Sequence, residues 1–215
     1  VHSGMWSIGL NMPVTDTMSK LMQISHWGTD FTHNMLNGST DFADCVNMDI
    51  TASDSPDFSN LTYINFRGCS SLVDANNTLN SSTVFGAEKI SLHKTFESCT
   101  SYNNDLTNWN TENVTDMNGT FNGCTVFNGD LSSWNTENVI TFRDTFKNTA
   151  FNNDSLANWN TENVTSFLST FYGCSNFNGD ITNWRTDSAD TLQSMFYSCS
   201  AFNRDINTKD RADGN

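Results

Sequence analysis

The sequence predicts an α/β repeat solenoid, with short parallel strands on one face and short helical or 3₁₀ turns on the other. Repeats of about 20 to 50 residues are typical of solenoids, because one coil cannot bury its apolar face alone. Two aromatic series share a period of 25 residues. They are Phe96, Phe121, Phe146, Phe171 and Phe196, and Trp109, Trp134, Trp159 and Trp184.

Each coil is expected to contain a strand and a helical segment. In the repeat that begins at Phe121, we expect a short strand over Asp130–Trp134 and a helical or 3₁₀ turn over Val139–Phe146. The apolar residues of the second segment are spaced i, i+3 and i+7, which places them on one helical face. Between the repeats' aromatic positions, Phe127-Asn128-Gly129 has the composition of a turn.

The repeats divide the chain into three segments of a single continuous domain. Residues 1–95 form degenerate N-terminal coils, residues 96–206 carry the regular repeats, and residues 207–215 form a polar C-terminal tail. The first segment keeps the F-x-x-C element at Phe42 and Phe66, although the steps there are 24 and 30 residues. We expect about eight coils in all.

The composition disfavours several classes of protein. Acidic residues outnumber basic ones by 24 to 10, giving a net charge of −14 and no basic stripe for nucleic acid or an anionic membrane surface. No run of about 18 apolar residues is present, so no membrane span is expected. Hydrophobic content is only 36%, but aromatic residues that recur in register favour a narrow, filled core over disorder.

The repeat resembles that of the BspA-like leucine-rich-repeat surface proteins. The shared elements are F-N-x-D-L-x-x-W at 127–134, N-V-T-x-M at 113–117 and M-F-x-x-C at 195–199, and the resemblance extends from Phe96 to Ile206. It implies a leucine-rich-repeat-type solenoid that is secreted or displayed at the cell surface. It also implies a role in adhesion or protein interaction and not in catalysis.

Stacking makes each repeat position a column of similar side chains. The tryptophan column fills the core or, as an alternative, stacks on sugars. An asparagine column is expected to hydrogen-bond from coil to coil, and an aspartate column to cap backbone N–H groups. A threonine column offers a hydroxyl row of the kind that binds ice, although its neighbours disfavour a flat face. These columns are Asn103, Asn128, Asn152, Asn178 and Asn203; Asp105, Asp130, Asp154, Asp180 and Asp205; and Thr111, Thr136, Thr161 and Thr186.

An acidic column consists of Glu112, Glu137, Glu162 and Asp187. Like charges about 5 Å apart repel by roughly 0.8 kcal/mol per pair in water, and hard oxygen ligands suit Ca²⁺. The repeat lacks the clustered D-x-D-x-D-G loop of a calcium site. A solvated acidic edge is therefore favoured over calcium, which is the only cofactor that the pattern admits.

Six cysteines share one column and form three candidate disulfides between neighbouring coils. The pairs are Cys45 with Cys69, Cys99 with Cys124, and Cys174 with Cys199. Neighbouring coils place Cα atoms about 5 Å apart, within the range of a disulfide, and disulfides fit an extracellular location. The alternative is a buried thiol that serves as a small apolar side chain.

Asn113 and Asn163 are the expected glycosylation sites, because both lie in N-x-T sequons at the same repeat position. The four histidines lack metal-ligand spacing, and no motif of a hydrolase, metalloprotease or nucleotide-binding enzyme is present. We therefore predict a non-enzymatic extracellular or surface-displayed protein that mediates protein or glycan interaction, an adhesion-type scaffold. The alternative is a self-assembling structural subunit of an extracellular filament, sheath or coat.

Overall fold

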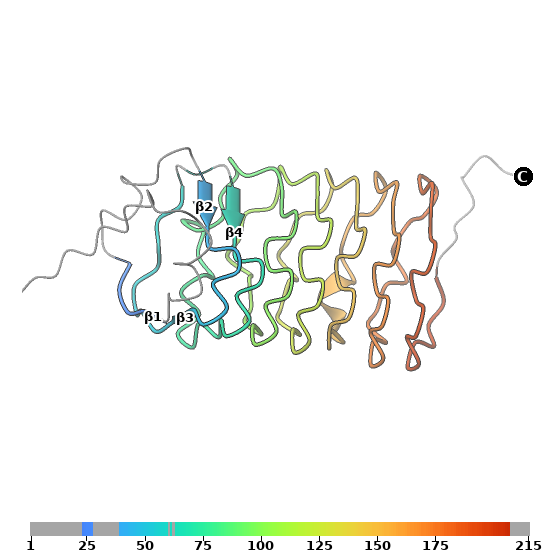
Figure 1. Cartoon of the computed structure of the whole chain (residues 1–215). Helices are drawn as coiled ribbons and strands as arrows, with labels where there is room; N and C mark the ends of the chain where they lie inside the picture. The colour runs from blue at the N-terminus through green and yellow to red at the C-terminus, as the bar shows by residue number, and fades with distance from the viewer. Residues whose placement is uncertain (1–22, 28–38, 60, 62, 207–215) are drawn as a thin grey trace, which may run out of the picture.

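The computed structural model describes residues 23–27, 39–59, 61 and 63–206. Over these ranges the chain forms an elongated stack of successive loops, and their order along the stack follows the sequence (Figure 1). Two short parallel pairs lie in the first part. Strand β1 (Gln23–Ile24) pairs with β3 (Asp49–Ile50), and β2 (Ser39–Asp41) pairs with β4 (Tyr63–Asn65). The 3₁₀ helix η3 covers Asp154–Leu156.

Beyond β4, isolated parallel bridges join successive repeats. They link Ser91 to Asp116, Asp116 to Thr141, Thr141 to Ser166, and Ser166 to Thr191. We call each segment between bridge residues a coil, so that residues 116–140 and 141–165 are two neighbouring coils. Every bridge joins residues 25 positions apart, which confirms that the sequence period is also the spatial period of the regular repeats.

The backbone after each bridge alternates between two kinds of hydrogen bond. In coil 141–165, the N–H groups of Phe142, Asp144, Phe146 and Asn148 donate to carbonyls of the next coil at 2.7–2.9 Å. The intervening N–H groups of Thr145 and Thr149 donate to Phe142 and Phe146, closing β-turns. Asp144 and Asn148 have φ values of 52° and 57°, as the third residue of a type II turn requires.

This geometry corrects the two elements that we assigned to the repeat. The expected helical turn over Val139–Phe146 contains the bridge residue Thr141, and the left-handed Asp144 is incompatible with a right-handed helix. The expected strand over Asp130–Trp134 is a turn, because the Asp130 carboxylate accepts from the N–H of Ser132, and the N–H of Trp134 donates to Leu131. A bridge therefore lies where the helical turn was expected, and a turn lies where the strand was expected.

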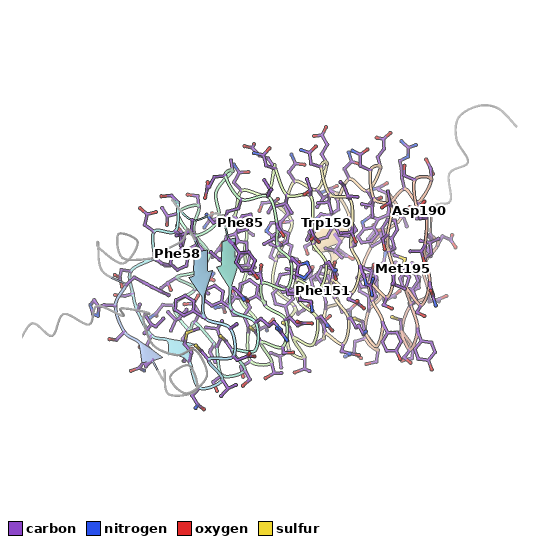
Figure 2. All side chains as sticks on the ribbon, turned by 45° about the horizontal axis from the view of Figure 1, so that its top comes forward. Phe58, Phe85, Phe151, Trp159, Asp190 and Met195 are labelled. Carbon is purple, nitrogen blue, oxygen red and sulfur yellow. The ribbon has the colours of Figure 1, made fainter. Side chains whose placement is uncertain are left out.

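The core is a set of aromatic columns that run along the stack. Figure 2 shows Phe58, Phe85, Phe151 and Trp159 inside it, while Asp190 lies at its margin. Burying one such ring stabilises the fold by about 1.5–3 kcal/mol. The central column has parallel rings whose centroids lie 5.3–5.8 Å apart. Its seven members are Phe42, Phe66, Phe96, Phe121, Phe146, Phe171 and Phe196.

The long step between Phe66 and Phe96 is organised by a buried carboxylate. Asp74 is fully buried and accepts hydrogen bonds of 2.9 Å from the N–H and hydroxyl of Thr78 and from the N–H of Leu79. Lys89, also fully buried, donates to the carbonyl of Phe58 at 3.0 Å and pairs with Glu88. Polar anchors therefore shape the coil that departs most from the period.

One hydrophobic cluster extends from Ile24 to Cys199. Residues 1–22 of the expected degenerate N-terminal coils and the predicted tail 207–215 lie outside the described residues. Within the ranges that are described, no helix has the length and apolar character needed to cross a bilayer.

Candidate functional site

The acidic column is exposed along one edge of the stack. Glu112, Glu137 and Glu162 each lie at a matching position of successive coils. At the end of the column, the guanidinium of Arg185 contacts the carboxylates of both Glu162 and Asp187. Over the ranges that the structure describes, no three His, Cys, Asp or Glu side chains are grouped to hold a metal ion. The arrangement supports a solvated acidic edge with one basic partner.

The cysteine column contains thiols and no disulfide among the described residues. All six side chains are buried, and five of them donate to the carbonyl of the central-column phenylalanine in the preceding coil. Cys124 donates to Phe96 and Cys174 to Phe146, both at 2.8 Å. In the structure these five thiols make S–H···O=C bonds, and the three expected disulfides stay a prediction. Burial raises the pKa of the Cys124 thiol.

The tryptophan and threonine columns both face the core. The four tryptophans are 1–4% exposed, and their indole N–H groups donate to leucine carbonyls of the preceding coil, as Trp134 does to Leu106 at 2.9 Å. Their predicted core role is confirmed, and they offer no face for a sugar. Thr111, Thr136 and Thr161 are 2% exposed and donate to the following coil, so their hydroxyls are not available for ice.

The predicted asparagine ladder is confirmed by direct hydrogen bonds between coils. The side-chain oxygen of Asn103 accepts from the N–H of Asn128 at 2.6 Å, and Asn128 accepts in the same way from Asn152 at 2.8 Å. The aspartate column works similarly, since Asp105 accepts from the N–H of Asp130 at 2.7 Å. These amides and carboxylates hold successive coils in register.

A groove of about 720 Å³ runs along the surface beside the acidic edge, and we call it the ladder groove. It crosses four successive coils, so that each coil supplies a matching part of its walls. One wall consists of Ala87, Asn113, Asn138 and Asn163, and the other consists of Ile90, Thr115, Ile140 and Thr165. The buried Val114, Val139 and Val164 lie between the two walls in sequence, so the side chains on either side of each valine face outward.

Hydrogen bonds between coils fix both walls. Asn113, Asn138 and Asn163 each donate from Nδ2 to a carbonyl of the preceding coil at 2.8 Å. On the other wall, the N–H of Ile140 donates to the carbonyl of Thr115 at 2.9 Å. The structure thus places both predicted glycosylation sites in the ladder groove, with their amide nitrogens already bonded, and glycosylation stays a prediction.

The groove was not predicted from the sequence, although its elements are present there. Asn113 and Asn163 were predicted only as glycosylation sites, and Ile90 lies outside the segment that was expected to be regular. The available signal was the pair of outward positions on either side of each valine. Exposed isoleucines at one of them, 60% for Ile90 and 49% for Ile140, mark a surface that core packing does not explain.

Comparison with known proteins gives one result. The family model described as "Mycoplasma protein of unknown function, DUF285" matches residues 90–210. The match includes the regular coils and most residues that line the ladder groove. Searches of curated proteins and of solved structures found no match.

Proposed function

The chain belongs to the family of Mycoplasma proteins of unknown function DUF285, and from that premise we propose that it is a non-enzymatic interaction protein of the cell surface or the extracellular space. The ladder groove would contact a surface protein or a glycan. The fold that we propose is a leucine-rich-repeat-type solenoid of the BspA-like kind, which would serve as an adhesion-type scaffold.

The observation that carries this proposal is the construction of the groove from four successive coils. A stack of repeats creates an extended surface on which matching positions recur, and such surfaces are what repeat proteins use for binding. Side chains that are not needed for the core are placed there at fixed spacing. Repetition also speaks against catalysis, because an active site requires a group that its neighbours lack.

A matched pair of variants tests the proposal. Ile140→Lys changes the groove, whereas Val126→Lys adds the same charge at a residue of similar exposure, 44% against 49%, that does not line the groove. Both proteins and the wild type would be applied to immobilised panels of oligosaccharides and synthetic peptides. Binding that Ile140→Lys abolishes and Val126→Lys retains supports the proposal. Equal behaviour of the two variants on every ligand would overturn it.

The second candidate function, a structural subunit, is favoured by the last described coil. The N–H groups of Leu192, Ser194, Phe196 and Ser198 hold the positions that donate to the next coil elsewhere, and they have no partner among the described residues. Leu192 occupies the core column of Phe167 and is 45% exposed. An open edge of this kind favours end-to-end addition of further chain.

Light scattering with electron microscopy of the same sample separates the two functions. If the open edge drives assembly, the wild type forms filaments or large particles, and Leu192→Lys reduces them to monomers while Ile140→Lys does not. If the protein is a discrete interaction module, all three proteins remain monomeric and only Ile140→Lys loses binding.

A further inference from the structure

The ladder groove repeats with a period of two coils along one wall. Ile90 and Ile140 alternate there with Thr115 and Thr165. On this wall an exposed isoleucine therefore recurs every second coil.

This period selects one conformation of an extended polypeptide. Hydrogen-bonded parallel neighbours lie about 4.8 Å apart, and equivalent ring centroids of neighbouring coils lie 5.3–5.8 Å apart. Ile90 and Ile140, two coils apart, therefore recur at roughly 10–12 Å along the groove. A β-strand presents side chains to one face every two residues, at about 6.7 Å. A polyproline II helix presents them every three residues, at about 9.3 Å. Of these two repeats, that of the polyproline II helix comes nearer to the spacing of the isoleucines.

The polar atoms of the groove are arranged to accept hydrogen bonds. The Oδ1 atoms of Asn113, Asn138 and Asn163 make no hydrogen bond with the described residues, because the amides bond to the protein through Nδ2. The hydroxyls of Thr115 and Thr165 donate to carbonyls of the preceding coil at 3.3 and 3.4 Å, which leaves their oxygens as acceptors. A polyproline II segment has no internal hydrogen bonds, so its N–H groups suit these acceptors.

Charge indicates a cationic occupant. Exposed Glu112, Glu137 and Glu162 directly precede the three asparagines of the wall, and no lysine or arginine lines the groove. The whole chain has a net charge of −14, which attracts cations to this edge. No aromatic side chain lines the groove either, and sugars commonly stack on such rings, so the walls favour a peptide over a glycan.

We infer that the ladder groove binds a cationic polypeptide segment in the polyproline II conformation, with an apolar side chain at every third residue. Four coils at about 4.8 Å spacing accommodate about five residues of such a helix at 3.1 Å per residue. Its apolar residues would contact Ile90 and Ile140. Its lysines or arginines would pair with Glu112 and Glu137, since Arg185 already pairs with Glu162. This inference rests on the proposed interaction function and names its partner class.

The test uses a synthetic peptide of three Pro-Lys-Val triplets with a terminal fluorophore, titrated with the whole protein and followed by fluorescence anisotropy. The comparison peptides are the same residues in scrambled order, which removes the three-residue period, and Pro-Glu-Val triplets, which reverse the charge. We expect the ordered cationic peptide to bind at least about tenfold more tightly than either. Raising the ionic strength from about 0.05 to 0.3 M should weaken the binding of the ordered cationic peptide.

Variants locate the binding. Ile140→Lys should weaken the ordered peptide by about tenfold or more, and Glu137→Gln by about threefold, whereas Val126→Lys should leave the affinity within about twofold. Ile140 and Glu137 are exposed, and circular dichroism would verify that both variants remain folded. Equal affinity for the ordered and scrambled peptides would overturn the polyproline II register, and insensitivity to Ile140→Lys would overturn the site.

The outcome also separates this inference from the broader function. If the cationic peptide fails while an oligosaccharide on the panel binds in a manner that depends on Ile140, the interaction function stands and the partner class is wrong. If neither class binds in a manner that depends on Ile140, both proposals fail.

Discussion

The regular coils after residue 90 and the coils before it use different means to fill a similar stack. After residue 90, each core position holds a similar side chain in every coil, and polar groups bond from one coil to the next. Before it, two ionisable side chains are fully buried, Asp74 and Lys89, and no other Asp, Glu, Lys or Arg of the described residues is buried. Lys89 stands in the column that holds Val114 and Val139 in the next coils, and Asp74 closes an enlarged loop.

The difference teaches where each region derives its stability. In the regular coils, the same kind of hydrogen bond between coils is repeated many times. The loss of any one of these polar contacts therefore removes only a small part of the free energy of unfolding. In the earlier coils, the Asp74 carboxylate alone accepts three hydrogen bonds, so its loss has no local substitute. We therefore expect core substitutions to have the largest effect in the regular region and polar substitutions to have the largest effect in the earlier one.

The largest expected effect follows from Phe146→Ala, in the middle of the regular coils. Phe146 is fully buried, and its ring lies 5.8 Å from Phe121, 5.5 Å from Phe171 and 4.5 Å from Phe151. Removal of a buried ring costs about 3–5 kcal/mol. Because each coil contacts only its neighbours, urea unfolding should also become less cooperative. A loss below about 1 kcal/mol would contradict the central role of this column.

The second effect is that of Asp74→Ala, which strands the buried N–H groups of Thr78 and Leu79 and should cost about 2–4 kcal/mol. Burial, above all, raises the pKa of the Asp74 carboxyl. A raised native pKa means that the stability contribution is complete below the unfolded pKa of about 3.9 and declines as pH rises through the native value. The cost of the substitution should thus be greater at pH 4 than at pH 7.

Asp57→Ala is the control, because the carboxyl pKa of Asp57 is shifted in the opposite direction to that of Asp74. The hydroxyl and N–H of Ser59 donate to Asp57 and lower the pKa of its carboxyl. Its contribution is therefore present above the unfolded pKa and is lost as pH falls. Urea titrations across this pH range should show the two substitutions diverging in opposite directions. Parallel pH profiles would show that Asp74 does not titrate as its burial requires.

Much of the fold follows from the sequence, because stacking equivalent residues requires only the period. The phenylalanine, tryptophan and asparagine columns were predictable at Phe121, Trp134 and Asn128 for that reason. The local backbone was not, because i, i+3 spacing fits a helix and also fits consecutive β-turns with left-handed residues. Asp144 and Asn148 tolerate that conformation, but neither residue type requires it.

The groove and the direction of each cysteine sulfur could not be predicted from the sequence, for related reasons. A column places cysteines in range of each other, yet the direction of each sulfur depends on turn geometry that the spacing does not specify. At Cys124 the turn directs the sulfur to a carbonyl. The ladder groove depends on the relative direction of positions on both sides of Val139, which becomes visible only once the bridge at Thr141 is known.

A smaller effect should follow from Asn128→Ala in the regular coils. The Asn128 side chain accepts from the N–H of Asn152 at 2.8 Å and contacts Asn153 at 3.2 Å. Because this residue is exposed, water replaces the lost acceptor, and we expect a cost of about 1 kcal/mol in urea unfolding. Ser132→Ala, at an exposed residue of the same coil, is the matched control and should change little. A cost as large as that of Asp74→Ala would erase the proposed contrast between the regions.

The mildest test changes no residue and measures the reactivity of the six thiols. Without reductant, the unfolded chain should take up six alkyl groups if the cysteines are thiols as in the structure, and a smaller number would support the predicted disulfides. In the folded protein, alkylation should be slow, because burial removes access and raises thiol pKa values, that of Cys199 to about 12. Cys199, in the last described coil and 9% exposed, should react first, and Cys124, in the interior of the stack, should react last. The rates at Cys45 and Cys69 then report directly whether the earlier coils open before the regular ones.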